Sequence, residues 1–321
     1  MNDGKMCTAQ VRSALVQTLK DYVGKIAAKD DQDIFRLPID RSFTMKGFGT
    51  VVTGTVIAGR IQKGAEIEIL PSRLKARVRG IQVHGLGVAE AVGGQRAALN
   101  LQGVDVDEVQ RGMVLAPPDS FTPSSMFDCH LQLLPSAARP IEKRKRIRFH
   151  TRTAEILGYA VLLGQERILP GESAFAQIRL EHPTLALPGD RFIIRQYSPM
   201  ITIGGGGILS AAATKHRNAD KSVIEQLRIF KEGTVDDQIM AVLEAAARDV
   251  REVSSIAAQR GLSLDQVRSR VNALKNAGRL RVLRESSEMV VSATAFQGLA
   301  DATTDAIHRF HLQHPSNQGM G

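Results

Sequence analysis

Cysteine, aromatic side chains and long apolar runs are all scarce in this chain of 321 residues. The two cysteines, Cys7 and Cys129, are too few to form a metal site by themselves. No apolar run of 18 residues is present and the N-terminus does not resemble a signal peptide, so we expect no membrane partner and a reducing, cytoplasmic location. Only 4% of the residues are aromatic, but 43% are hydrophobic, which is ample for packed cores.

A phosphate-binding loop of the form G-x-x-x-x-G-K-S/T is also lacking. Such a loop needs backbone amides around the phosphates, a lysine that reaches them and a hydroxyl that holds magnesium. The two Gly-Lys pairs, which begin at Gly4 and Gly24, continue into Met6 and Ile26, and no Asn-Lys pair is present for guanine recognition. We therefore expect that this chain binds no GTP, holds no metal or other cofactor and is not an enzyme.

Positive charge, in contrast, is plentiful. Lys and Arg number 42 against 33 Asp and Glu, a formal net charge of +9. Such an excess indicates an anionic partner, of which nucleic acid is the first candidate, although charge that only maintains solubility is the alternative. The length suggests two to four domains.

The most informative stretch runs over residues 33–64, where an alternating strand meets a glycine turn and a second strand. A period of two indicates a half-buried strand. The alternation predicts one face with Ile34, Arg36, Pro38 and Asp40 and another with Phe35, Leu37, Ile39 and Arg41. The turn Lys46–Gly49 and the β-branched run TVVTGTVIAG then complete a hairpin.

The strings FRLPIDR and GFGTVVTG in this hairpin resemble the second domain of translational GTPases. The Ile39-Asp40-Arg41 ending, the segments VRGIQVHG and GQRAALNL and a helical C-terminal region narrow the resemblance to bacterial selenocysteine-specific elongation factors. It covers roughly residues 10–315. The resemblance implies a chain that lacks the N-terminal GTPase domain and the last C-terminal winged helices of that family, in which GTP and magnesium are the cofactors of the full-length protein.

Short alternating strands separated by Gly and Pro recur about every ten residues, which is typical of small antiparallel barrels. They predict one β-barrel over residues 33–117 and, after a Pro/Ser linker, a second over residues 126–213. Such tandem barrels resemble the pair that follows the GTPase domain in elongation factors. We therefore expect a multidomain protein, with two barrels of the translation-factor type followed by an α/β winged-helix domain.

Helical periodicity occurs at both ends of the chain. Residues 1–32 read as one amphipathic helix, which in the family closes the GTPase domain, and residues 214–231 read as a polar helical linker. Residues 232–292 read as three helices and a hairpin, with Ser263 capping the third helix and Gly278 ending it. This order is that of a winged helix, and residues 293–321 resemble the start of another one that is truncated.

The candidate selenocysteinyl-binding residues are Asp40, Arg41 and Arg96, which match the Asp-Arg and Gly-Gln-Arg motifs of the family. A selenol is far more acidic than a serine hydroxyl, so two guanidinium groups would favour the selenolate over the neutral seryl side chain. Asp40 would orient an arginine or accept from the ammonium group of the amino acid. An ordinary Asp-Arg pair at the end of a strand is the alternative interpretation.

The densest basic run, over residues 139–152, contains seven Lys or Arg against the single Glu142. It predicts contacts to a tRNA backbone by Arg144, Lys145, Arg146, Arg148 and His150. A solvated charged loop is the alternative for this run, and His150 alone is more often a surface hydrogen-bonder. The glycines at 204–207 suggest a β-bulge or a tight barrel closure rather than a phosphate cradle.

In the C-terminal domain, the third predicted helix would turn Arg268, Arg270 and Lys275 towards nucleic acid. The family resemblance implies selenocysteinyl-tRNA, the ribosome and an mRNA hairpin that marks UGA codons as partners. We accordingly expect a truncated selenocysteine-specific elongation factor. The alternatives are a winged-helix regulator that binds nucleic acid without a role in translation, against which the barrels argue, and an enzyme, against which the missing phosphate loop argues.

Overall fold

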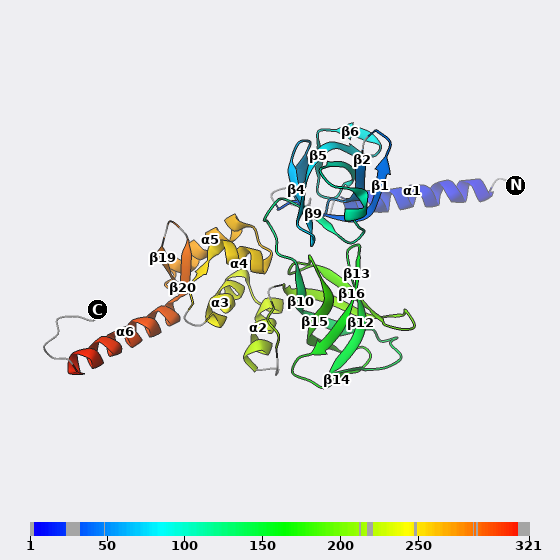
Figure 1. The fold of residues 1–321 in the computed structure, drawn as a ribbon. Coiled ribbons are helices and arrows are strands. Elements are labelled where there is room, and N and C mark those ends of the chain that lie inside the picture. The colour runs from blue at the N-terminus through cyan, green and yellow to red at the C-terminus, as the bar shows by residue number, and fades with distance from the viewer. Residues whose placement is uncertain are drawn as a thin grey trace.

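The computed structural model describes residues 3–23, 33–47, 49–211, 213–216, 221–246, 249–284, 286 and 288–313. Two β-barrels lie one above the other in Figure 1, and a helical region lies beside the second barrel. Among the described helices, none combines the length and the apolar character needed to cross a bilayer.

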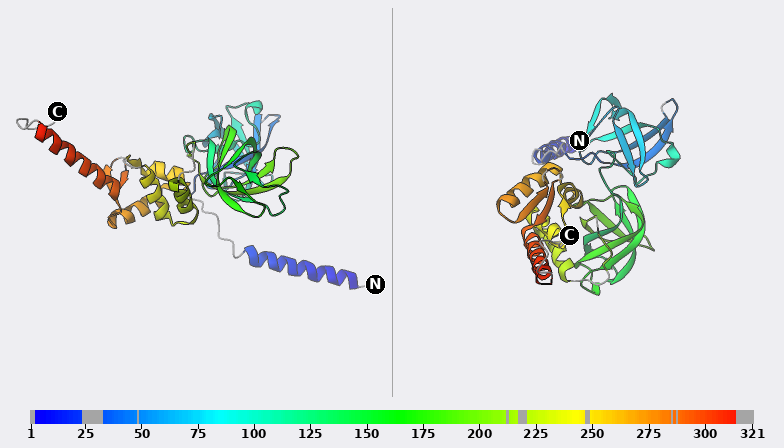
Figure 2. Two further views of the ribbon diagram at one scale, coloured as in Figure 1. Left: turned by 90° about the horizontal axis from the view of Figure 1, so that it is seen from below. Right: turned by 60° about the vertical axis from the view of Figure 1, so that its left-hand side comes forward.

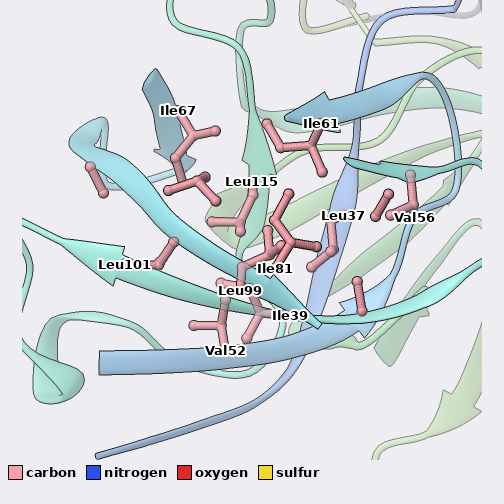
Figure 3. Packing of buried hydrophobic residues seen from close by; sticks show 14 of the residues in the cluster. Leu37, Ile39, Val52, Val56, Ile61, Ile67, Ile81, Leu99, Leu101 and Leu115 are labelled. Atoms are coloured by element: carbon pink, nitrogen blue, oxygen red, sulfur yellow. The ribbon is translucent and has the colours of Figure 1, made fainter. Parts of the chain in front are cut away.

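The first barrel closes through six strands in the order β4-β9-β1-β2-β8-β5, with β5 pairing back onto β4. These strands are β1 (Leu37–Met45), β2 (Gly49–Thr55), β4 (Glu66–Leu70), β5 (Leu74–Val83), β8 (Arg96–Gln102) and β9 (Val114–Ala116). Short additions are β3 (Arg60–Gln62), β6 (Leu86–Val88), β7 (Glu90–Val92) and the 3-10 helix η1 (Val106–Glu108). Aliphatic side chains from all the main strands fill its interior, as Figure 3 shows for Leu37, Ile39 and Leu99.

The predicted hairpin between β1 and β2 is present, but a bulge between Ile39 and Arg41 interrupts its register. Phe35, Leu37 and Ile39 are buried as the alternation predicts. The assignment of Arg41 to the same face is wrong, because the extra residue at the bulge turns Arg41 out to solvent.

The second barrel is closed in the order β10-β15-β13-β12-β16-β17. Its strands are β10 (Ser124–Leu133), β12 (Arg144–Thr151), β13 (Ala154–Leu162), β15 (Ser173–Thr184), β16 (Arg191–Gln196) and β17 (Thr202–Ser210), with a small pair β11 (Ile141–Glu142) and β14 (Arg167–Ile168). Phe127, Phe149 and Phe192 stack in its core. The fold of two consecutive antiparallel barrels is thus confirmed.

The four glycines at 204–207 lie on β17, between β10 and β16. A Cβ atom on Gly204, Gly205 or Gly206 would collide with backbone carbonyl oxygens of the neighbouring strands. The glycines therefore permit close approach of strands where the barrel closes, which confirms the prediction of a tight closure.

The two barrels meet through a small apolar cluster and one buried carboxylate. The cluster consists of Leu70, Val114 and Ala116 from the first barrel and Leu185 and Leu187 from the second. Next to it, Asp190 accepts hydrogen bonds from Arg36 of the first barrel at 2.9 Å and from Arg152 at 2.7 Å. The backbone N–H of Leu187 donates to the same carboxylate.

The C-terminal region contains α2 (Lys221–Glu232), α3 (Val235–Ala245), β18 (Arg251–Glu252), α4 (Val253–Arg260), α5 (Leu264–Asn276), β19 (Leu280–Arg284) and β20 (Met289–Ser292). The three helices and the hairpin occur in the predicted order. The Ser263 side chain accepts from the Gln266 N–H and so caps α5, as expected, and Gly278 follows the helix with a φ of 69°.

Helix α2 is more than the polar connector that its sequence suggests. It buries Leu227 and Phe230 in a core that also includes Leu163 and Leu209 of the second barrel. These apolar residues recur at a spacing of three, so α2 joins the helices to the barrel surface.

The two terminal helices bury less of their surface than the other helices do. Helix α1 (Asp3–Val23) confirms a helix within the first predicted segment, and the side chains of its residues Val11, Leu15 and Leu19 are exposed. Residues 24–32 of that segment lie outside the described residues. Helix α6 (Ala293–Gln313) has no buried residue, and the rest of its predicted segment is likewise not described. Both helices extend away from the barrels in Figure 2.

We expect Asp190→Asn to destabilise the junction, because it leaves the half-buried Arg36 without its counter-charge. Breaking a buried pair costs about 3 kcal/mol, whereas an exposed pair contributes below about 1 kcal/mol. Urea denaturation should show this contrast against Glu166→Gln, which breaks the exposed Lys143–Glu166 pair. Equal losses of unfolding free energy in the two variants would contradict a central role for Asp190.

The same carboxylate predicts a dependence on pH. Burial raises the pKa of Asp190, but the charge of Arg36, the Leu187 N–H and Arg152 outweigh burial, and the net pKa is lowered. A lowered folded pKa means that the stabilisation is complete above the unfolded pKa of about 4 and is lost as the pH falls through the folded value. In the Asp190→Asn variant, the free energy of unfolding should therefore fall less steeply with decreasing pH below about pH 4 than in the unaltered chain.

Candidate functional site

The outer surface of the first barrel brings together Asp40, Arg41 and Arg96, as the sequence predicts. Asp40 is the extra residue of the bulge in β1, Arg41 follows it, and Arg96 is the first residue of β8. Strand β2 pairs with both, and the Arg96 guanidinium reaches across it to donate to Asp40 at 2.7 Å. The bulge is what allows two consecutive residues, Asp40 and Arg41, to serve the same outer surface.

Positive charge surrounds Asp40. The hydrogen bond from Arg96 is the main reason that the pKa of Asp40 is lowered; burial opposes this effect, and the charges of Arg96, Arg111 and Arg41 add to it. Arg111, which precedes β9, was not among the residues that the sequence pointed to. Its only signal was an Arg-Gly pair before a strand, which is too common to indicate a site.

The Arg96 guanidinium can still bind a ligand while it is paired with Asp40. The Arg96 side chain is 55% exposed and the Asp40 side chain 26%. A guanidinium carries five N–H donors, so the single bond to Asp40 leaves others for a ligand. The pair therefore acts as a preoriented cation at the barrel surface rather than as a closed internal contact.

A cavity of about 650 Å³ lies on the same outer surface. Ala98 and Asn100, which line it, follow Arg96 at alternate positions of β8 and therefore share its face. Met45 of β1 lines it as well, and Lys63 and Arg79 are its charged residues. The described lining residues include no carboxylate, so the cavity suits a ligand that is neutral or negative.

A second basic surface lies on β12 of the second barrel. Arg144, Arg146 and Arg148 alternate with the buried Ile147 and Phe149, so the three arginines share the outer face of this strand. Each lies over a tyrosine ring: Arg144 is 4.0 Å from the centroid of Tyr159, and Arg146 is 4.3 Å and Arg148 5.5 Å from that of Tyr197.

Acidic side chains also hold these arginines. Arg146 donates to Glu181 at 3.2 Å and Arg148 to Glu155 at 2.8 Å. The tyrosines and glutamates lie on β13, on β15 and in the turn after β16. The sequence of β12 alone therefore does not predict this pairing. The outer face of β12 is therefore an ordered array rather than a solvated charged loop.

Two predicted members of this array differ from the rest. Lys145 occupies the opposite side of β12, on the side of Ile147, where it is half-buried. His150 shares the outer face, but burial is the main reason that its pKa is lowered, so the imidazole is neutral near pH 7. Its Nε2 atom is buried and has no hydrogen-bond partner among the described residues.

On α5 of the C-terminal region, Arg268, Arg270 and Lys275 are exposed, as predicted. Both arginines have acidic partners, however. Arg268 donates through two nitrogens to Glu288, and Arg270 donates through two nitrogens to Asp236. These pairs reduce the positive potential that the helix presents to a polyanion.

We expect Arg96→Gln to raise the pKa of Asp40 more than Arg41→Gln does, because the hydrogen bond from Arg96 is the largest cause of the lowering and the Arg41 charge is the smallest. Carbon-13 NMR titration of the Asp40 carboxyl measures both shifts. A larger rise in the Arg41 variant would mean that the Asp40–Arg96 contact is not the dominant one.

Comparison with known proteins agrees with the geometry of the two barrels. Residues 49–116 match the family model of elongation factor Tu domain 2. Residues 129–215 match the model of the β-barrel domain of selenocysteine-specific elongation factors. The chain resembles the crystal structure of a bacterial selenocysteine-specific elongation factor, EF-Sec, with a TM-score of 0.74 at 22% identity over 96% of this chain and 47% of that one, which shows a shared fold.

A curated relative gives the sequence relationship. The selenocysteine-specific elongation factor of Desulfomicrobium baculatum is 35% identical over 309 residues, which are 95% of this chain and 49% of that protein. The chain thus spans about half the length of the relative it matches. The chain is therefore a homologue of selenocysteine-specific elongation factors, and the part that it shares with the relative comprises both barrels and the α/β region.

Proposed function

We propose that the chain serves in selenocysteine incorporation at UGA codons by binding selenocysteinyl-tRNA, with the aminoacyl end on the first barrel. The observation that carries this proposal is the Asp40–Arg96 pair with Arg41 and Arg111 around it, beside a cavity whose described lining residues include no carboxylate. The homology supports it, because selenocysteine is the amino acid in the names of the relatives.

The charge of the site explains how one amino acid is preferred. Selenocysteine is an anion at neutral pH, and the exposed donors of Arg96 and Arg41 bind an anion more strongly than a neutral hydroxyl. Asp40 fixes the Arg96 fork before the ligand arrives, so less side-chain freedom is lost on binding. The same carboxylate can accept from the ammonium group of the esterified amino acid.

We assign the tRNA backbone to the outer face of β12. Three arginines at alternate positions span two repeats of about 6.6 Å, comparable to the spacing of successive phosphates. Phosphate oxygens can replace Glu155 and Glu181 as acceptors, while Tyr159 and Tyr197 keep the guanidinium groups in place. Lys145 is left out of this contact because of its position on the other side of the strand.

The C-terminal region supports a winged-helix interpretation, because α3, α4 and α5 precede a hairpin of β19 and β20 and the sheet has the order β18-β20-β19. By family resemblance an mRNA hairpin is a partner whose main binding modules are the last winged helices of the family, and the ribosome is the expected site of action. Nothing in the comparisons points to a regulator outside translation.

We assign no nucleotide or magnesium site to this chain. Neither Gly-Lys pair is followed by the Ser or Thr that would hold magnesium, so the residues present do not fit GTP. The proposed role of this chain is therefore to bind RNA and to read the amino acid, without a chemical step.

Arg96→Ala should weaken the binding of selenocysteinyl-tRNA by roughly ten- to a hundredfold and hardly affect seryl-tRNA, because a charge-assisted hydrogen bond contributes about 1.5–3 kcal/mol only when the ligand is the anion. Side-by-side titrations measure the contrast. Arg77→Ala is the matched control, since it removes the same charge from the same barrel outside the cavity lining. Equal losses for both tRNAs would remove the assignment of a selenocysteine pocket.

Replacing Arg144, Arg146 and Arg148 together with Gln should reduce the salt dependence of tRNA binding. Each phosphate contact contributes about 0.9 to the slope of log K against log salt, so the slope should decrease by roughly three. Lys145→Gln is the control on the same strand and should leave the slope within error. An unchanged slope in the triple variant would exclude β12 as the footprint of the tRNA backbone.

A further inference from the structure

A separate cavity of about 430 Å³ lies where the second barrel meets the C-terminal region. Strands β10, β16 and β17 form one side of it and helices α2, α3 and α4 the other. Figure 1 shows these helices along the flank of the barrel. We call it the basic cleft, after the four basic residues that line it, His130, Arg191, Lys231 and Arg260. It shares no lining residue with the cavity beside Arg96.

The register of three strands creates the space. His130 on β10 and Arg191 on β16 both lie opposite Gly207 of the intervening strand β17. Since Gly207 has no side chain, the region between the imidazole and the guanidinium stays open. A Cβ atom at Gly207 would have one neighbour within 4 Å, a terminal nitrogen of Arg191 at 3.9 Å.

Arg260 gives the cleft a buried cation with no acidic partner among the described residues. Its guanidinium donates to the carbonyl of Leu209 at 2.6 Å and to the amide oxygen of Gln238 at 2.9 Å, and it lies 3.9 Å from the centroid of the Phe230 ring. These contacts use three of its five N–H donors. Burial lowers the pKa of Arg260 to about 10, so the side chain stays charged near pH 7.

The other charges of the cleft are also incompletely balanced. Arg191 is exposed and has no ion pair within the described part of the chain. Lys231 has one partner, the adjacent Glu232 at 3.2 Å, and both side chains are open to solvent. Burial lowers the pKa of His130, the charge of Lys231 lowers it further and Glu232 opposes this, so the positive field dominates at the imidazole.

A buried cation without a counter-ion is costly, and a bound anion is the simplest compensation. Arg, Lys and His converging from a barrel and two helices match the several oxygens of a phosphate group, which accept charge-assisted hydrogen bonds from several directions. We propose that the basic cleft binds a phosphate group and thereby links the C-terminal region to the second barrel. The group belongs either to free phosphate or pyrophosphate or to the backbone of an RNA strand.

The test uses pyrophosphate and the full chain, with ionic strength held constant by NaCl. Calorimetry should show saturable binding that becomes at least about tenfold weaker in the double variant Arg191→Gln, Lys231→Gln, which loses two charged donors. The matched control is Arg228→Gln, Arg167→Gln, which removes two charges from α2 and β14 outside the cleft. No saturable binding, or equal weakening in both double variants, would overturn the proposal.

A second measurement does not depend on the variants. Proton NMR of the His130 ring in the unaltered chain should show a higher pKa when pyrophosphate is bound, because the anion favours the imidazolium form. An unchanged His130 pKa at saturation would place the ligand elsewhere and refute the cleft.

Hexauridylate distinguishes the two sources of phosphate. If the natural ligand is an RNA backbone, the hexamer should raise the His130 pKa, and pyrophosphate should displace the hexamer. If the natural ligand is free phosphate, pyrophosphate should raise the His130 pKa and the hexamer should leave it unchanged. The discrimination between selenocysteinyl- and seryl-tRNA at Arg96 is independent of both results. The failure of either proposal can therefore be recognised without the other.

Discussion

A single buried carboxylate, Asp190, connects the parts of the molecule on which its proposed function depends. It holds Arg36, four residues before Asp40 on the same chain segment, and Arg152, which directly follows β12. One side chain thus ties the strand that leads into the proposed amino-acid site to the strand that carries the basic outer face. Because the Asp190 carboxylate is buried and lies next to the apolar cluster at Leu187, its pairing with Arg36 restrains the two barrels as one unit. A tRNA that contacts both surfaces needs such a fixed separation between them.

Closed barrels suit this task because they expose rigid outer faces. The main strands of each barrel are paired on both sides, so a residue that points outward has a position defined by the ladder and not by a flexible loop. Two local features of the strands lie where function is proposed. The bulge in β1 presents Asp40 and Arg41 together, and Gly207 leaves the opening of the basic cleft.

Several arginines of the proposed binding surfaces are held by acidic partners before any ligand binds. Asp40 orients Arg96, Glu181 and Glu155 orient Arg146 and Arg148, and Asp236 and Glu288 hold the arginines of α5. These acids weaken the net attraction of each surface for a polyanion but define the direction of the donors. Arg260 is the contrasting case, since its partners among the described residues are neutral acceptors and an aromatic ring, which is the basis for the anion proposed in the cleft.

Local pattern alone determined much of this protein: the alternation that buries Phe35, Leu37 and Ile39, the barrel strands and the cap at Ser263. These features depend on the period of side-chain burial or on short-range hydrogen bonds, which a sequence displays directly. Family motifs singled out Asp40, Arg41 and Arg96, but only the tertiary structure decided that Arg96 pairs with Asp40, that Arg41 leaves the buried face, that Arg111 joins Asp40 and that four basic residues from β10, β16, α2 and α4 line one cleft. Those outcomes depend on a one-residue bulge and on contacts between segments distant in the chain, and neither changes the local pattern from which the sequence is read.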